Sequence, residues 1–60
     1  MYESLVGKTL NEVKAYAVEN NLKARVSNID GSPMVLTCDY DPSRMNLCVE
    51  NNIVTEIIVG

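Results

Sequence analysis

The fold is decided by residues 9–21, TLNEVKAYAVENN, which carry the signals of a single amphipathic helix. Thr9 is followed three residues later by Glu12, the spacing of a capping box, in which each residue's side chain accepts a hydrogen bond from the other's backbone amide. From Leu10 onward, apolar residues recur at i, i+3 and i+7, which places them on one helical face. The two Asn that close the stretch tolerate the left-handed conformation that ends helices. We therefore predict a helix over residues 10–20.

The remainder of the chain has the patterns of strands and turns. Apolar and polar residues alternate over residues 22–27 (LKARVS) and over residues 44–49 (RMNLCV), which is the period of a half-buried strand. Residues 30–33 (DGSP) have turn chemistry and should end the first strand. Residues 51–52 (NN) predict a tight turn, because Asn accepts positive φ. A third strand should then occupy residues 53–59 (IVTEIIV).

This third strand is apolar on both faces except at Thr55 and Glu56. A strand of that composition is either buried on both faces or uses one face to contact another copy of the chain.

Composition restricts the classes of function. The chain has 60 residues, enough for one domain spanning residues 1–60, and 5 Lys plus Arg against 8 Asp plus Glu give a net charge of −3. That balance argues against a nucleic-acid partner, which requires clustered cations. No stretch approaches the roughly 20 apolar residues that cross a membrane. Residues 1–4 lack the features of a secretory signal, so we expect either a cytoplasmic protein or the mature form of an exported one.

The residues that usually carry catalysis or bind metals are scarce. The absence of His removes the usual general base and the commonest zinc ligand, and two Cys cannot complete a tetrahedral site. An enzyme would have to rely on Cys38, Asp39 or Tyr40 with no group to activate them. We therefore expect no enzymatic activity, no metal and no cofactor. Cys38 and Cys48 are either two reduced thiols, which we favour, or one disulfide.

Residues 34–43 do not fit a simple pattern. An apolar start is followed by a polar run that contains Pro42, which lacks an amide donor and favours an extended residue before it. A segment this long in a small domain is usually functional or disordered. The alternative is a wide hairpin in which Met34–Asp39 forms an extra strand.

Several pieces of the sequence resemble one family in the same order. Residues 4–9 (SLVGKT), before the capped helix, and residues 57–60 (IIVG) resemble the two ends of the potato inhibitor I family, which includes chymotrypsin inhibitor 2 and the eglins. Residues 37–40 (TCDY), followed by Arg44, resemble its reactive loop and the strand that supports it. Residues 39–47 (DYDPSRMNL) are most similar to the Asp-Tyr-x-Pro-x-Arg-Leu-Asn pattern of its microbial elastase-inhibitor relatives.

The resemblance implies an α+β fold in which one α-helix packs on a small twisted mixed β-sheet with an extended reactive-site loop. Members of this family inhibit serine proteases of the chymotrypsin and subtilisin types by offering that loop as a substrate. A loop already held in shape avoids the entropic cost of ordering a flexible peptide. If the bond is cut, the scaffold keeps the new amine beside the acyl-enzyme, where resealing competes with hydrolysis.

The resemblance assigns the protease-binding loop to six residues: Leu36, Thr37, Cys38, Asp39, Tyr40 and Asp41. Cys38 would enter the main specificity pocket, and Asp39 would follow the scissile bond. Arg44 would brace the loop through the Asp39 carboxylate; the alternative is an ordinary exposed ion pair. Asn46, also assigned to loop support, stands where plant members carry a second supporting Arg. Tyr40 would either contact the protease or cover the small core.

We therefore expect an inhibitor of subtilisin-like or elastase-like serine proteases, because Cys38 is small and apolar and suits their pockets. The alternative is a cytoplasmic bacterial or phage interaction module that uses the same scaffold to bind a non-protease partner. A homodimer formed through the final strand or an open sheet edge is compatible with both.

Overall fold

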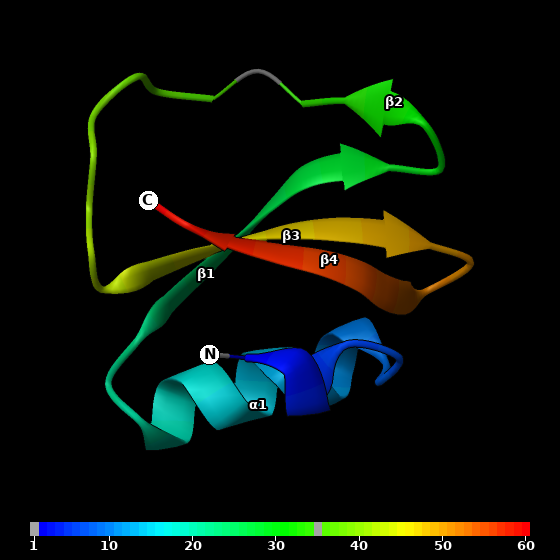
Figure 1. Cartoon of the computed structure of the whole chain (residues 1–60), viewed down its shortest axis with the longest axis horizontal. Coiled ribbons are helices and arrows are strands. Elements are labelled where there is room, and N and C mark those ends of the chain that lie inside the picture. The colour runs from blue at the N-terminus through cyan, green and yellow to red at the C-terminus, as the bar shows by residue number, and fades with distance from the viewer. Residues whose placement is uncertain (1, 35) are drawn as a thin grey trace.

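The computed structural model describes residues 2–34 and 36–60, and it contains one α-helix and a four-stranded mixed sheet (Figure 1). The elements, in chain order, are a short 3-10 helix η1 (Glu3–Leu5), α1 (Leu10–Glu19), β1 (Lys23–Ile29), β2 (Ser32–Pro33), β3 (Arg44–Glu50) and β4 (Ile53–Val59). The α+β fold expected for this chain, with one helix packed on a small mixed sheet, is confirmed. No helix within residues 2–34 and 36–60 is long and apolar enough to span a membrane.

Helix α1 begins and ends as its sequence predicts. The Thr9 hydroxyl accepts from the Glu12 amide at 3.3 Å, and the Glu12 carboxylate accepts from the Thr9 amide at 3.0 Å, so both bonds of the capping box are present. After the helix, Asn21 has φ 55°, the left-handed conformation that Asn tolerates. The helix therefore needs few tertiary contacts to define its ends.

The strands lie in the order β2-β1-β3-β4. β1 and β3 are parallel, whereas β1–β2 and β3–β4 are antiparallel. The predicted turn at Asn51-Asn52 joins β3 to β4, and both residues have positive φ, 50° and 67°. Such values give the twist that suits a two-residue hairpin.

Two details of the first hairpin differ from expectation. β1 continues past residue 27 to Ile29, and the turn is confined to Asp30-Gly31, where φ is again positive at 49° and 81°. Ser32 and Pro33, predicted as part of that turn, instead pair with Ile29 and Asn28 as β2. Pro33 fits here because β2 is an edge strand, where a missing amide donor is tolerated.

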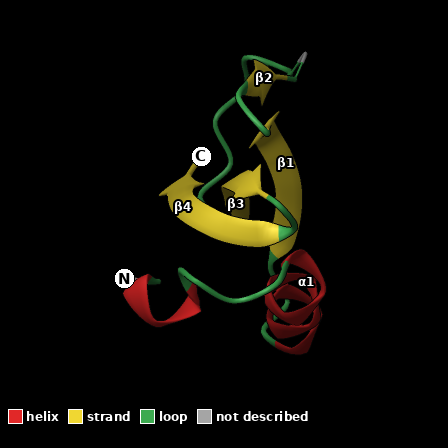
Figure 2. Cartoon of the chain, turned by 90° about the vertical axis from the view of Figure 1, so that its right-hand side faces the viewer, coloured by secondary structure: helices red, strands yellow, loops and turns green. Residues whose placement is uncertain are grey.

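The core fills the space between α1 and one face of the sheet (Figure 2). The alternating apolar positions of β3 are its centre: Met45, Leu47 and Val49 are at most 1% exposed. The other buried apolar residues come from η1, the helix and β4: Leu5, Val13, Ala17 and Val54. So small a core leaves the opposite face of the sheet free for polar side chains.

The prediction that β4 is buried on both faces is wrong. The core lies on the face of the sheet that α1 covers, so only one face of β4 meets it. Val54 is fully buried on that side, whereas Ile58 is 54% exposed. The alternative, that the exposed face contacts another copy of the chain, stays a prediction.

Replacing Leu47 with Ala should lower the free energy of unfolding by about 2–5 kcal/mol, because the fully buried side chain would leave a cavity that this core has few residues to fill. The matched control is Val18→Ala, which removes a side chain 78% exposed and should change stability by no more than about 0.5 kcal/mol. Urea denaturation of both variants measures the difference. Equal stabilities would contradict the assignment of Leu47 to the core.

Candidate functional site: a braced surface loop

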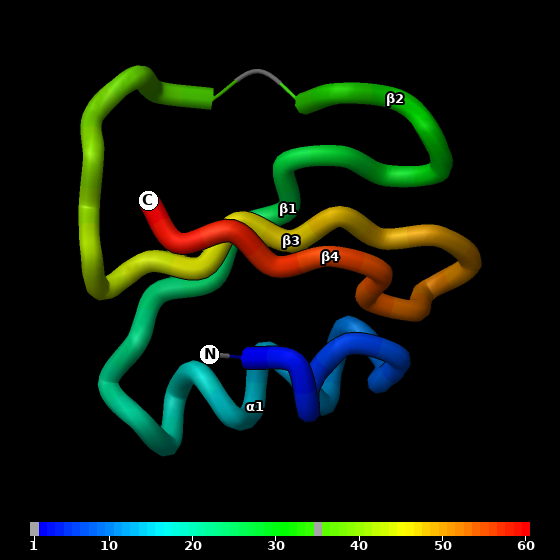
Figure 3. The backbone as a smooth tube through the Cα atoms, viewed as in Figure 1, coloured from blue at the N-terminus to red at the C-terminus, as the bar shows by residue number. Residues whose placement is uncertain are grey.

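The loop between β2 and β3 crosses the sheet on the side opposite α1 and passes around the C-terminal end of the chain (Figures 1 and 3). Residues 36–41 form neither helix nor strand, so the extra strand considered for Met34–Asp39 is absent from its described residues; Val35 lies outside them. After β2, the described chain makes one more backbone hydrogen bond beside this hairpin, from the Met34 amide to the Ser27 carbonyl of β1 at 3.0 Å. Beyond it, arginine side chains hold the chain in place of a strand ladder.

The outer part of the loop is open to solvent. Thr37, Cys38, Asp39 and Tyr40 are exposed, whereas Leu36 and Asp41, at either side of them, are half-buried. The six residues expected to bind a protease are therefore an exposed centre between two more sheltered ends.

Arg44, at the start of β3, holds the Asp39 side of the loop. Its Nη2 donates to the Asp39 backbone carbonyl at 2.7 Å, and its Nη1 lies 3.4 Å from the Asp39 carboxylate. Its Nε donates to the Gly60 carbonyl at 2.8 Å. The Arg44 side chain is only 11% exposed and that of Asp39 is 63% exposed, so this contact differs from an ordinary exposed ion pair: the backbone bond is the short one.

Arg25, from the middle of β1, holds the other side of the loop. Its Nη1 donates to the Thr37 hydroxyl at 3.0 Å, and its Nη2 lies 3.5 Å from the Thr37 carbonyl. The sequence pattern indicates only that Arg25 faces away from the core. Its role was missed because contact with the loop depends on tertiary pairing, which leaves no local signal.

Asn46 supports the loop through Arg25. It is 8% exposed, its Oδ1 accepts from Arg25 Nε, and its Nδ2 donates to the carbonyls of Ile58 and Gly60, each at 2.9 Å. The hydrogen bonds of Asn46 therefore fix the orientation of the guanidinium group and the end of β4, and none of them reaches the loop.

Lys23 anchors the far end of the loop. Its Nζ lies 2.7 Å from Asp41 Oδ2, while Asp41 Oδ1 accepts from the Ser43 amide and hydroxyl at 2.9 and 2.6 Å. The Lys23 ammonium is the main cause that holds the pKa of Asp41 far below its ordinary value. Hydrogen bonds from the hydroxyl and the amide of Ser43 lower that pKa further. This carboxylate thus ties the loop down where β3 begins.

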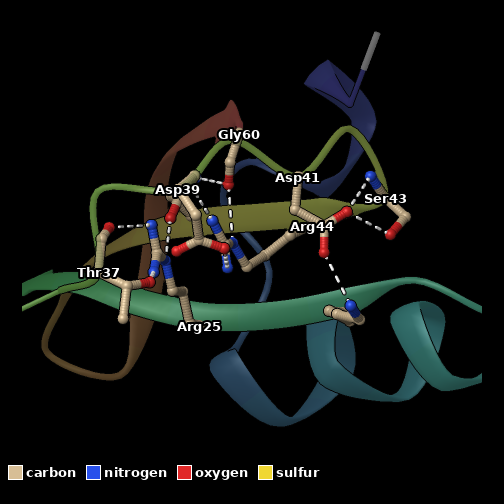
Figure 4. Close-up of polar contacts among 9 residues, drawn as sticks. Arg25, Thr37, Asp39, Asp41, Ser43, Arg44 and Gly60 are labelled. Atoms are coloured by element: carbon tan, nitrogen blue, oxygen red, sulfur yellow. Dashed lines mark hydrogen bonds and ion pairs between the residues drawn. The ribbon is translucent and has the colours of Figure 1, made fainter.

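The four residues beneath the loop form two register pairs of the parallel strands. Lys23 lies beside Arg44 and Arg25 beside Asn46. Figure 4 shows the contacts of Arg25 and Arg44 with the loop. We call Lys23, Arg25, Arg44 and Asn46 the support quartet. Three of its members are cations, and the loop places the carboxylates of Asp39 and Asp41 against them.

The Asp39 carboxylate is stabilised in its charged form. The Thr37 hydroxyl and then the backbone amide of Asp39 itself lower the pKa of this group, and Arg44 lowers it further.

One interpretation of the sequence had Tyr40 cover the small core. The structure contradicts it, because Tyr40 is not among the residues packed against the core. Its side chain is 74% exposed, and two of its ring carbons lie 3.6 and 3.7 Å from the position that a Cβ on Gly60 would take. The ring thus lies near Gly60 and is largely open to solvent.

Both cysteines are free thiols, as favoured from the sequence. Cys38 is exposed on the loop, whereas Cys48 Sγ lies 3.7 Å from both Ser27 Oγ and Glu56 Oε1 on the sheet. The described part of the chain contains no group of three or more His, Cys, Asp or Glu side chains arranged to hold a metal ion.

No protein-family model matches the sequence, and no significant match is found among curated proteins.

Arg25→Ala should make the exposed part of the loop mobile and lower the free energy of unfolding by about 1–3 kcal/mol, because buried Asn46 loses its donor. Amide ¹⁵N order parameters of residues 37–40 should fall toward the range of flexible loops, below about 0.6. Arg25→Lys keeps the charge but lacks the fork that reaches two partners, so it should rescue little. The control is Lys14→Ala, which removes a charge from the exposed face of α1. Unchanged order parameters in Arg25→Ala would refute the bracing role.

The ion pair of Asp41 with Lys23 should make the free energy of unfolding depend on pH in the acidic range. Because the folded-state pKa of Asp41 is lowered, its contribution is complete above the unfolded pKa, about 3.9, and is lost as the pH falls through the lowered value. Asp41→Asn should therefore be less stable than the parent at pH 7 and lose less stability between pH 5 and pH 2. Lys23→Met, which removes the main cause of the shift, should also show a shallower decline. Parallel curves for all three proteins in denaturant titrations would contradict this.

Proposed function

We propose that this protein inhibits serine proteases by presenting residues 37–40 as a substrate-like loop, with Cys38 in the main specificity pocket and Asp39 after the scissile bond. One observation carries the proposal: arginines from two neighbouring strands grip the loop on opposite sides of Cys38. Arg25 contacts Thr37 before it, and Arg44 contacts Asp39 after it. The resemblance of the sequence to the potato inhibitor I family points the same way.

Bracing of this kind matters because a protease binds its substrate as an extended strand. A flexible peptide loses about 0.5–1.5 kcal/mol for each side chain immobilised on binding, in addition to the cost of ordering its backbone. A loop whose carbonyls at Thr37 and Asp39 are already held avoids much of that loss. The same contacts leave the exposed side chains free to enter the protease.

The two arginines also provide a physical route to inhibition after cleavage. If the Cys38–Asp39 bond is cut, each new end remains attached to its own arginine and its own strand. The amine of Asp39 then stays beside the acyl-enzyme, where well-oriented groups reach effective molarities of about 10⁵ M or more. Resealing would therefore compete with hydrolysis, and the loop would be turned over slowly.

The loop chemistry favours one class of protease. The Cys38 side chain is small and apolar, which suits the shallow apolar pockets of subtilisin-like and elastase-like enzymes. It has no cation for the acidic pocket of a trypsin-like enzyme.

A second candidate is an interaction module that binds a non-protease partner or another copy of the chain. The observation in its favour is exposed apolar surface at the edge strand: Ile58 of β4 is 54% exposed, and Val6, after η1, is 44% exposed. Sedimentation of the protein at high concentration tests self-association, and a monomer would remove that form of the hypothesis.

Inhibition assays test the main proposal directly. The protein should inhibit subtilisin or elastase at micromolar concentration or below and leave trypsin active. The double variant Arg25→Ala/Arg44→Ala should bind at least about tenfold more weakly, a conservative figure for losing charge-assisted contacts, and should be digested faster. Mass spectrometry of the mixture locates the cut. Rapid digestion of the parent protein without inhibition of any enzyme would overturn the proposal.

A further inference from the structure

The outer edge of β4 is paired for only part of its length. Residues 7–9 run beside its first two residues. The Gly7 amide donates to the Val54 carbonyl at 2.8 Å, and the Val54 amide donates to the Lys8 carbonyl at 2.9 Å. From Thr55 onward, no backbone hydrogen bond among the described residues reaches this edge from outside the sheet. An extended segment of another chain can add to such an open edge as a further strand.

An open pocket of about 180 Å³ lies where this pairing stops. Its lining comes from two segments, residues 2–6 in and around η1 and residues 55–57 of β4. Figures 1 and 2 show η1, next to the N label, on the side of the molecule where β4 forms the sheet edge. The lining residues are Tyr2, Glu3, Val6, Thr55, Glu56 and Ile57.

We propose that the open edge of β4 and this pocket form a second binding site, which takes an extended basic segment of a partner protein. The segment adds as a strand beside residues 55–57 and places one Lys or Arg side chain in the pocket. None of the lining residues belongs to the loop or to the support quartet. The inference therefore goes beyond protease inhibition and does not depend on it.

The lining suits a long cationic side chain. Tyr2, Val6 and Ile57 offer apolar surface for the aliphatic stem of a Lys or Arg. The carboxylates of Glu3 and Glu56, one from each segment, offer acceptors for its charged head. An anionic side chain would instead be repelled by both carboxylates, so the pocket selects for positive charge.

The charge of the rest of the chain favours the same partner. Of its five cations, three belong to the support quartet, where Asp39 and Asp41 pair with two of them. Outside that site the side chains comprise two lysines against six carboxylates, a net charge of −4. The surface away from the loop therefore attracts a basic segment and speeds its association.

A second copy of the chain fits this edge poorly. Pairing β4 with another β4 would join two strands that each carry Glu56 and no cation, and like charges opposed across a strand pair are destabilising. Charged side chains on edge strands commonly protect against such pairing. The carboxylate that opposes a second β4 attracts a basic strand, so the edge discriminates between the two occupants.

Titration with synthetic peptides tests the site. The probes are two nonapeptides with blocked ends, one alternating threonine with lysine and the other alternating threonine with glutamate. At about 1 mM or below, the lysine peptide should shift the ¹⁵N amide signals of residues 3–6 and 55–59 in a saturable manner. It should also slow hydrogen exchange at residues 55–59, and its binding should weaken as salt is added. The glutamate peptide should change none of these signals.

Exposed positions supply the matched variants. Glu56→Gln removes a carboxylate from the pocket and should weaken binding of the lysine peptide about threefold, the size expected for one exposed charge contact. Val6→Lys, at a position 44% exposed, puts a cation of the chain's own beside the pocket and should weaken binding further. Glu19→Gln, the charge-matched control on α1, should bind as the parent does.

The inference is overturned if the lysine peptide causes no shifts, if both peptides bind equally, or if Glu56→Gln binds as tightly as Glu19→Gln. Shifts confined to residues 37–40 would also overturn it, and so would shifts at β4 that follow protein concentration without peptide, because they would mark a second copy at the edge. Failure of the inhibitory proposal is seen separately. A protein that inhibits no protease but binds the lysine peptide as described loses that proposal and keeps this site.

Discussion

Parallel pairing of β1 with β3 is the constraint on which the rest of this structure depends. Two adjacent parallel strands must start at the same end of the sheet, so the chain has to return along the sheet's length, which takes a dozen or more residues. Residues 30–43 make this return, first as the turn and β2 and then as the loop. The same pairing sets Lys23 beside Arg44 and Arg25 beside Asn46 beneath it. One topological choice thus produces both the loop and its support.

Local signals were sufficient for much of the fold. The capping box at Thr9 and Glu12 placed α1, and Asn51-Asn52 marked the β3–β4 turn, because caps and tight turns depend on residues adjacent in sequence. Alternation located the buried face of β3. For β4, an apolar composition suggested burial on both faces, although α1 covers only one face of the sheet and Ile58 is exposed. Whether a second layer covers a face of a strand depends on the whole chain, which a local pattern does not contain.

The same difference between local signals and long-range contacts applies to the candidate site. The contact between Arg44 and Asp39 joins residues five apart and was anticipated through a resemblance; the contacts of Arg25 with Thr37 and of Lys23 with Asp41 span 12 and 18 residues and were not. Asn46 was assigned to loop support, but the way it acts follows from register, since only parallel pairing brings Arg25 beside it. Arg44 and Asn46 could therefore be assigned to loop support from the sequence resemblance, whereas Lys23 and Arg25 could not.

The charges of the site explain why loop and sheet depend on each other. Lys23, Arg25 and Arg44 are three cations on neighbouring positions of one sheet face, and on their own they would repel one another. Carboxylates at Asp39 and Asp41 and carbonyls at Thr37 and Gly60 meet them from above. The loop is held over the sheet because it pairs with these cations, and the cations are tolerated because the loop supplies acceptors to them. A polar face built in this way keeps the exposed residues Cys38 and Tyr40 in place at little expense to the small core, which lies on the other side of the sheet.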